Sequence, residues 1–172
     1  MLDKSALLLS KEVEKALEKT FCNLCENGEH FYYCTLTTSG DGGMPAFSAW
    51  SKEALLKMED DELKWSYADS PYCLYKYDEY WKVVEDMWWK RPHIHNLPYE
   101  QYVEEFTVRI EILVLAMKNL DNAGFFGLNQ KRDDIFINVE LAPPDKTNTE
   151  RAQLLNPSTS VILKEWLVEM AE

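Results

Sequence analysis

Residues 30–39 read HFYYCTLTTS, and this stretch predicts a strand near the start of the chain. β-Branched and aromatic residues dominate it, as is typical of strands. After the turn Ser39–Gly43, residues 44–50 (MPAFSAW) predict a second strand, with Pro45 at its start or on an edge. Two strands joined by so short a connection are expected to pair antiparallel.

The segments before and after these strands in the sequence show the apolar spacing of helices. Residues 5–26 place apolar side chains at steps of three and four. A longer stripe of the same kind follows Pro98 and consists of Tyr99, Val103, Phe106, Ile110, Leu113, Met117 and Leu120. Shorter helices are expected at three further places, namely residues 52–58 after Ser51, residues 151–156 after a capping box of Thr147 and Glu150, and the segment capped by Asn156-Pro157.

Alternating apolar residues predict two more strands. Leu63, Trp65 and Tyr67 alternate with polar or small residues and predict a third strand over residues 63–69. Residues 135–141 repeat the pattern and predict a fourth. We therefore expect an α+β fold in which a small antiparallel sheet of about four or more strands packs against several helices, in a single domain over residues 1–172.

The composition excludes some function classes. With 30 acidic and 18 basic residues the chain carries a formal charge of −12, so phosphate backbones are repelled and no nucleic-acid partner is expected. No apolar run reaches the ~18 residues of a membrane span, and the N-terminus lacks a signal-peptide pattern. Four cysteines in such a chain indicate reduced thiols in the cytoplasm. The charge favours a basic protein partner, and it also fits a cytosolic protein whose acidity serves only solubility.

An aromatic run raises the question of a binding surface. Residues 63–91 read LKWSYADSPYCLYKYDEYWKVVEDMWWKR and hold nine of the 22 aromatic residues. On a helix over residues 77–90, one side is formed by Tyr77, Tyr80, Trp81, Val83, Val84, Met87 and Trp88. Trp89 falls on the opposite, charged side with Glu85 and Asp86. Two interpretations stay open: another element, such as residues 93–97, covers Trp89, or it is an exposed anchor for a partner.

Motifs for redox or metal chemistry are incomplete. Cys22-x-x-Cys25 lies in the last turn of a helix, where the dipole opposes a thiolate, and Cys34 and Cys73 are isolated. His93-x-His95 has no third ligand nearby in the sequence. We therefore expect no metal and no cofactor. Asp69, where the predicted third strand meets a helix, is either a helix cap or a functional carboxylate.

Several short motifs together resemble a known family. They are His30-Phe31-Tyr32-Tyr33 with Thr37-Thr38 and Gly40, Trp65-Ser66 with Ala68-Asp69-Ser70-Pro71-Tyr72, Phe125-Phe126-Gly127 with Arg132 and Asn138-Val139, and Leu155-Asn156-Pro157. This combination is similar to the bacterial family catalogued as domain of unknown function 4303. The family has no established enzymatic activity that the resemblance could carry over to this chain, and the resemblance implies an association with toxin systems, where many small domains serve as immunity proteins. The chain departs from the usual pattern at Cys22-x-x-Cys25 and Trp88-Trp89.

Three functional hypotheses follow. The first is a cytoplasmic interaction domain that binds and occludes a cognate, basic protein such as a toxin, through Trp89, Glu85, Asp86, Asp69 and the turn Glu59, Asp60, Asp61 and Glu62. The second is a small hydrolase with Asp69, His93 and His95 in an aromatic cleft. The third is a homo-oligomer that uses Trp89 on a self-complementary face.

Overall fold

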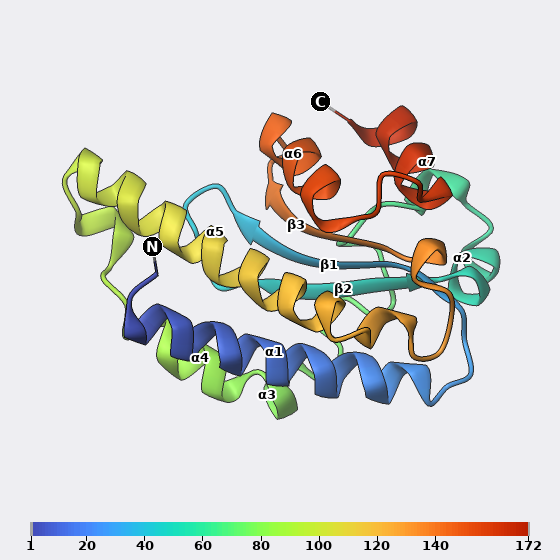
Figure 1. Cartoon of the computed structure of the whole chain (residues 1–172), viewed down its shortest axis with the longest axis horizontal. Coiled ribbons are helices and arrows are strands. Elements are labelled where there is room, and N and C mark those ends of the chain that lie inside the picture. The colour runs from blue at the N-terminus through green and yellow to red at the C-terminus, as the bar shows by residue number, and fades with distance from the viewer. Residues whose placement is uncertain (1, 172) are drawn as a thin grey trace.

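The computed structural model describes residues 2–171, and a three-stranded sheet lies at its centre (Figure 1). β1 (Phe31–Ser39) is the central strand; β2 (Ala46–Ser51) pairs with it antiparallel and β3 (Phe136–Ala142) pairs with it parallel. The prediction of an α+β fold is confirmed. The prediction of an antiparallel sheet of four or more strands is wrong, since the described residues form three strands. The parallel pairing of β3 with β1 is possible because a long connection that contains α2 to α5 separates β3 from the β1–β2 hairpin.

Seven α-helices pack around this sheet within residues 2–171. They are α1 (Lys4–Cys25), α2 (Lys52–Met58), α3 (Tyr77–Tyr80), α4 (Lys82–Trp88), α5 (Tyr99–Asn122), α6 (Lys146–Leu155) and α7 (Val161–Met170). Short 3-10 turns are η1 (Asp61–Leu63), η2 (Ile94–Asn96), η3 (Phe125–Gly127) and η4 (Arg132–Asp134). None of the helices in this described part of the chain has both the length and the apolar character needed to cross a bilayer.

The two faces of the sheet are covered by different elements. Figure 1 shows α1 and α5 running along one face, with α3 and α4 against α1. Leu36, Phe47 and Val139 point into the core on this side and are fully buried. On the other face, α7 and residues 63–67 cover a smaller core around Trp50 and Phe136. The sheet is therefore buried on both faces.

Side chains cover the outer edge of β3, which explains why the sheet has no further strand on this side. The side-chain amide of Asn156 accepts from the backbone N–H of Ile137 (2.9 Å) and donates to its C=O (2.7 Å). Asn148 makes the same pair of bonds with Leu141 (2.7 and 3.1 Å). Two asparagine side chains thus supply the hydrogen bonds that a fourth strand would supply.

The predicted third strand over residues 63–69 is wrong. This segment forms turns, and its carbonyl groups accept from side chains of β2: Trp50 Nε1 donates to Ser66 O (2.6 Å) and Ser48 Oγ to Tyr67 O (2.7 Å). The alternation has another cause, since Trp65 is buried in the smaller core and Leu63 and Tyr67 pack against it. The segment continues along the edge of β2, where Leu74 N donates to Phe47 O (2.9 Å).

The single helix predicted over residues 77–90 is divided into α3 and α4. Trp81 separates them with φ −101° and ψ 0°, and its buried indole donates to Thr20 Oγ1 of α1 (3.0 Å). Most of the predicted apolar side packs inward, but Val83 is 54% exposed. The residue at which the helix is interrupted is thus the one whose indole is buried against α1.

α5 carries the predicted stripe only in its C-terminal half. Leu113, Met117 and Leu120 are buried, whereas Tyr99 and Val103 are exposed. Figure 1 shows the N-terminal end of α5 extending past the strands.

The helix caps also differ from the prediction. Asp145 caps α6 in place of Thr147, and Ser160 caps α7 in place of Asn156. Asn156 instead ends α6, where its side chain is engaged with β3.

Candidate functional site

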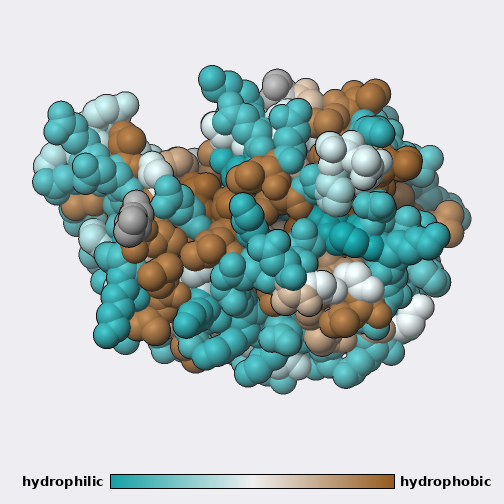
Figure 2. Space-filling model, viewed as in Figure 1, coloured by the Kyte–Doolittle hydropathy of each residue, from teal (hydrophilic) through white to brown (hydrophobic). Residues whose placement is uncertain are grey.

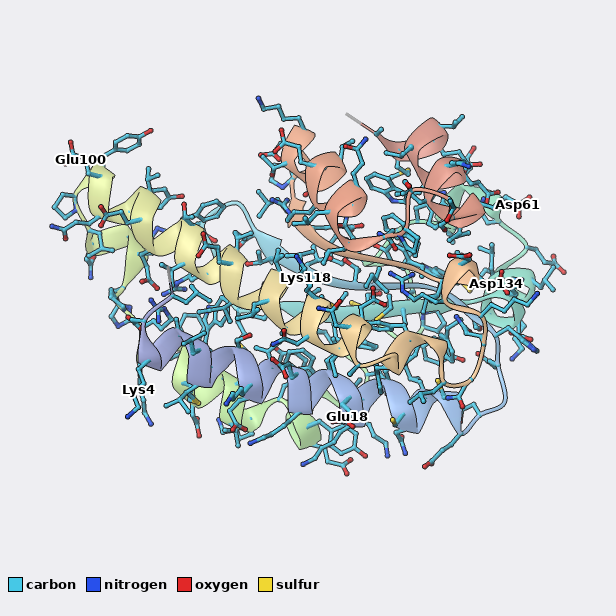
Figure 3. All side chains as sticks on the ribbon, in the orientation of Figure 1. Lys4, Glu18, Asp61, Glu100, Lys118 and Asp134 are labelled. Carbon is cyan, nitrogen blue, oxygen red and sulfur yellow. The ribbon has the colours of Figure 1, made fainter. Side chains whose placement is uncertain are left out.

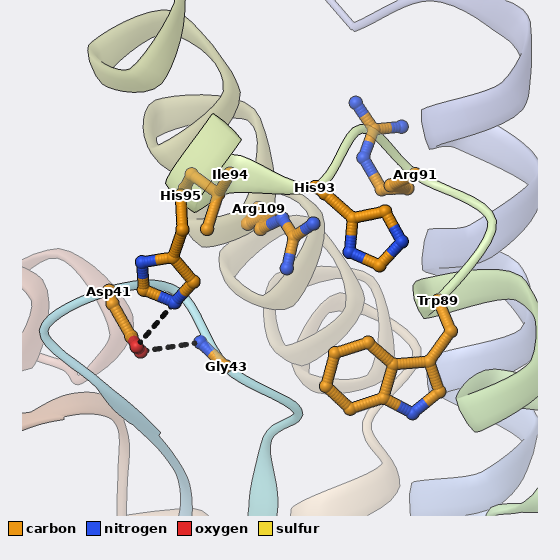
Figure 4. Close-up of a pocket in the computed structure, with 8 residues that line it drawn as sticks. All are labelled: Asp41, Gly43, Trp89, Arg91, His93, Ile94, His95 and Arg109. Atoms are coloured by element: carbon orange, nitrogen blue, oxygen red, sulfur yellow. Dashed lines mark hydrogen bonds and ion pairs between the residues drawn. The ribbon is translucent and has the colours of Figure 1, made fainter. Parts of the chain in front are cut away.

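The turn between β1 and β2 and the loop between α4 and α5 meet at a small pocket, here called the Trp89 pocket (Figure 4). It has a volume of about 100 Å³ and is lined by Asp41, Gly43, Trp89, Arg91, His93, Ile94, His95 and Arg109. The sequence analysis singled out Trp89 and both histidines. The fold brings these three together with Asp41.

Arg109 of α5 holds the two walls of this pocket together. Its guanidinium donates to Gly42 O in the β1–β2 turn (2.8 Å) and to Pro92 O in the α4–α5 loop (2.9 Å). Gly42 has φ +69°, and a Cβ there would lie 3.1 Å from Arg109 Cδ. A glycine is therefore required both by the backbone conformation and by the close approach of the arginine.

A buried ion-pair cluster lies beneath the pocket. Arg91 makes two hydrogen bonds to the carboxylate of Glu105 (2.6 and 2.7 Å), and Arg109 Nε donates to the same carboxylate (3.0 Å). All three side chains are at most 8% exposed. The bidentate geometry fixes the start of the α4–α5 loop onto α5. This cluster was not predicted from the sequence.

His95 Nε2 lies 3.1 Å from an Asp41 carboxylate oxygen at the pocket, a contact drawn in Figure 4 that is an ion pair when the imidazole is protonated. The Ser39 hydroxyl also donates to Asp41, which lowers the pKa of that carboxyl below its usual value. The Asp41 carboxylate therefore lies between the Ser39 hydroxyl and the His95 imidazole and contacts both. Nucleophilic catalysis requires the imidazole between the other two, so this arrangement does not activate Ser39.

Trp89 is half exposed at the C-terminal end of α4. One part of its indole lines the pocket beside His93, and 53% of the side chain faces solvent (Figure 4). The α4–α5 loop thus supports the ring without covering it. Glu85 and Asp86, one turn earlier, both pair with Lys82 (2.9 and 3.4 Å).

The other predicted residues lie elsewhere. Asp69 accepts a hydrogen bond from the Ser66 hydroxyl in the loop beside β2 and is not among the residues that line the pocket with His93 and His95. Glu59, Asp60, Asp61 and Glu62 form an exposed turn after α2. Asp61, labelled in Figure 3, lies at the opposite end of the molecule from the α4–α5 loop seen in Figure 1. The fold therefore does not gather the proposed acidic residues on one surface.

Neither cysteine of the Cys22-x-x-Cys25 motif has a lowered pKa. Burial and the nearby carboxylates of Glu18 and Glu26 raise the pKa of Cys22, and burial raises that of Cys25, so both favour the thiol form. Within residues 2–171, no three His, Cys, Asp or Glu side chains converge as a metal site requires.

A second exposed feature is an apolar groove between α1, α5 and α6, here called the α1–α5 groove. It is lined by Leu2, Leu7, Glu111, Val114, Leu115, Lys118 and Leu154 and has a volume of about 420 Å³. Figure 2 shows apolar residues gathered over α1 and α5 on this face, between hydrophilic ones. It is a second surface on which a protein partner is sterically able to bind.

Comparison with known proteins identifies the family. Neither the curated proteins nor the solved structures contain a match to the chain. A family model described as "Domain of unknown function (DUF4303)" matches residues 12–157. This range includes every motif that carries the resemblance, the whole sheet and the Trp89 pocket. The chain therefore belongs to the DUF4303 family.

Proposed function

We propose that the chain is a cytoplasmic, immunity-type interaction domain that binds and occludes a basic protein, such as a bacterial toxin, through the Trp89 surface. This surface comprises Asp41, Glu85, Asp86, Trp89, His93 and His95. The observation that carries the proposal is Trp89, which stays 53% exposed beside a loop held by the ion pairs of Arg91, Glu105 and Arg109. Exposed tryptophans of this kind are enriched among the residues that dominate binding energy at interfaces.

The support under Trp89 is already ordered without a partner. The cluster of Arg91, Glu105 and Arg109 fixes the loop on one side of the ring, and α4 fixes the backbone on the other. A side chain held in place before binding loses little conformational entropy when a partner arrives. The Trp89 surface thus has the preorganisation expected of an anchor.

Charge favours a basic partner. Next to Trp89 the charges of this segment balance, because Lys82 and the exposed Lys90 offset Glu85 and Asp86, so the attraction of a basic partner comes from the chain as a whole. The chain as a whole carries −12. A field of this sign accelerates the encounter with a cationic protein, and salt screens it over about 8–10 Å.

A pair of matched variants tests the proposal. The tagged full chain is used to capture proteins from the source cells, and capture is compared among wild type, Trp89→Ala and Val83→Ala. Val83 lies on the same helix and is 54% exposed, against 53% for Trp89. We expect capture of a basic protein that Trp89→Ala weakens about 30-fold or more, as for an interface hot spot, and that Val83→Ala leaves unchanged.

Two outcomes contradict the proposal. Equal capture by wild type and Trp89→Ala would move the interface to another surface. A wild-type chain that is dimeric by light scattering, and monomeric as Trp89→Ala, would identify the occupant of the Trp89 surface as a second copy of the chain.

A further inference from the structure

The α1–α5 groove exposes apolar side chains that come from three different helices. Leu7 of α1 is 43% exposed and Leu154 of α6 is 57% exposed, and the partly buried Val114 and Leu115 of α5 complete the apolar lining. Figure 1 shows α1 and α5 running side by side on this outer face of the molecule. The groove shares no lining residue with the Trp89 pocket, so a partner bound here does not need to contact that pocket.

Two exposed residues of opposite charge also line the groove, one on each side of the apolar residues of α5. They are Glu111 and Lys118. Seven positions separate them, which is two helical turns or about 10.5 Å along the axis, so they lie on the same face of α5. This spacing exceeds the three or four positions at which side chains on one helix pair with each other. Val114 and Leu115 lie midway between the two charges.

This order of charges is complementary to itself when a second copy of α5 approaches in the opposite direction. A two-fold axis that crosses α5 at right angles between Val114 and Leu115 places Glu111 of each copy opposite Lys118 of the other, which gives two symmetric ion pairs. In a parallel arrangement, Glu111 would face Glu111 and Lys118 would face Lys118, and like charges placed opposite each other disfavour association. Charge therefore selects the antiparallel orientation and one register.

The area of this face is close to what a stable dimer needs. α1 has 22 residues and α5 has 24, so at 1.5 Å per residue the two helices are about 33 and 36 Å long. With each helix about 10 Å across, together they present a face of about 700 Å². A standard stable interface buries about 800 Å² on each partner. Leu154 extends the apolar part of the face onto α6.

We propose that the α1–α5 groove binds a second copy of the chain and forms a two-fold symmetric dimer with antiparallel α5 helices. Exposed apolar side chains supply the contact area, and the Glu111–Lys118 pairs fix the orientation. The residues that line the groove carry one negative and one positive charge, so the groove is neutral although the chain carries −12. Two copies therefore meet where the self-repulsion of an acidic chain is weakest. The dimer does not depend on the function proposed for the Trp89 surface.

Charge-reversal variants of the full chain test both the dimer and its orientation. Sedimentation equilibrium gives the mass and the dimer Kd, and we expect wild type to dimerise with a Kd below about 100 µM. Glu111→Lys places positive charges opposite each other at both symmetric contacts, and Lys118→Glu places negative charges there. Each variant alone is expected to weaken the dimer at least tenfold. Both positions are exposed, so neither substitution disturbs the packing of the monomer.

Mixing the two variants restores opposite charges at both contacts of an antiparallel heterodimer. We expect the equimolar mixture of Glu111→Lys and Lys118→Glu chains to associate within about threefold of the wild-type Kd. Glu104→Lys is the control, because it changes the net charge as Glu111→Lys does but lies at an exposed position of α5 outside the groove, and it should leave the dimer unchanged.

Four outcomes would overturn the dimer. They are a wild-type chain that stays monomeric, a dimer that both single variants leave intact, a mixture of the two variants that does not associate, and a dimer that Trp89→Ala abolishes while Glu111→Lys leaves it intact. The last result would place the second copy on the Trp89 surface. A monomeric chain that loses capture of another protein only as Glu111→Lys would make that protein the occupant of the groove.

Discussion

Glu105 shares one buried carboxylate between two arginines, Arg91 and Arg109, and both walls of the Trp89 pocket depend on this contact. A buried ion pair is weak evidence for stability, because desolvation offsets much of the attraction. Removing one partner is different, since it leaves uncompensated charge in the interior. Here, loss of Glu105 would leave two guanidinium groups without their shared carboxylate.

We therefore expect Glu105→Ala to lower the free energy of unfolding by about 3–5 kcal/mol. Urea denaturation of the variant and of wild type gives this difference directly. Glu104→Ala is the matched control, because Glu104 is the exposed neighbour on the same helix and its loss should change stability by less than about 0.5 kcal/mol. Equal stability of the two variants would show that the cluster does not hold the loop.

At the scale of single residues, the sequence analysis singled out Trp89 as either covered or exposed, and it made no prediction for Glu105 and Arg109. A helical wheel places Trp89 on the charged side of its helix, and this position is indeed half exposed. Glu105 and Arg109 are four residues apart and in phase with the buried Ile112 and Ala116. Opposite charges at this spacing on the buried side of a helix were a usable signal for an internal ion pair.

At the scale of elements, the edge of β3 is protected by side chains of α6 in place of another strand. Asn148 and Asn156 each make two hydrogen bonds to the backbone of β3, and Arg151 donates to Val139 O. An unprotected edge would offer backbone groups to another chain. The same contacts fix α6 onto the sheet.

Asn156→Ala should therefore destabilise the fold by about 2–4 kcal/mol, because it leaves the buried N–H and C=O of Ile137 without partners. Gln153→Ala, at an exposed position of α6, is the control and should be close to neutral. Thermal or urea unfolding distinguishes the two. A nearly neutral Asn156→Ala would mean that water or a shift of α6 replaces these bonds.

The elements that the sequence predicted correctly are those with long, regular patterns. α1, β1 and α5 agree with the prediction within about two residues, although the predicted apolar stripe of α5 is buried only in its C-terminal half. Residues 63–69 alternate like a strand but run along β2 as a loop, since Trp50 and Ser48 occupy their carbonyl groups. Side-chain contacts between distant segments determine that residues 63–69 form a loop. The spacing of apolar residues along the chain gives no information about such contacts.

At the scale of the whole molecule, negative charge is distributed over the surface. Figure 3 shows Glu100 at one end of the molecule, Asp61 and Asp134 at the other end, and Glu18 on α1 between them. The net charge of −12 predicts attraction to a basic partner but does not determine where that partner binds. The location of the partner depends on exposed apolar side chains, and the Trp89 surface and the α1–α5 groove both present such side chains.

Hydrogen–deuterium exchange of the chain, alone and with its captured partner, tests the central claim most directly. The account predicts slower exchange in the complex at residues 84–97 and 41–43, which carry Trp89 and the walls of its pocket. It predicts unchanged exchange at residues 52–62, at the opposite end of the molecule. Protection confined to the α1–α5 groove or to residues 52–62, with residues 84–97 unchanged, would contradict it.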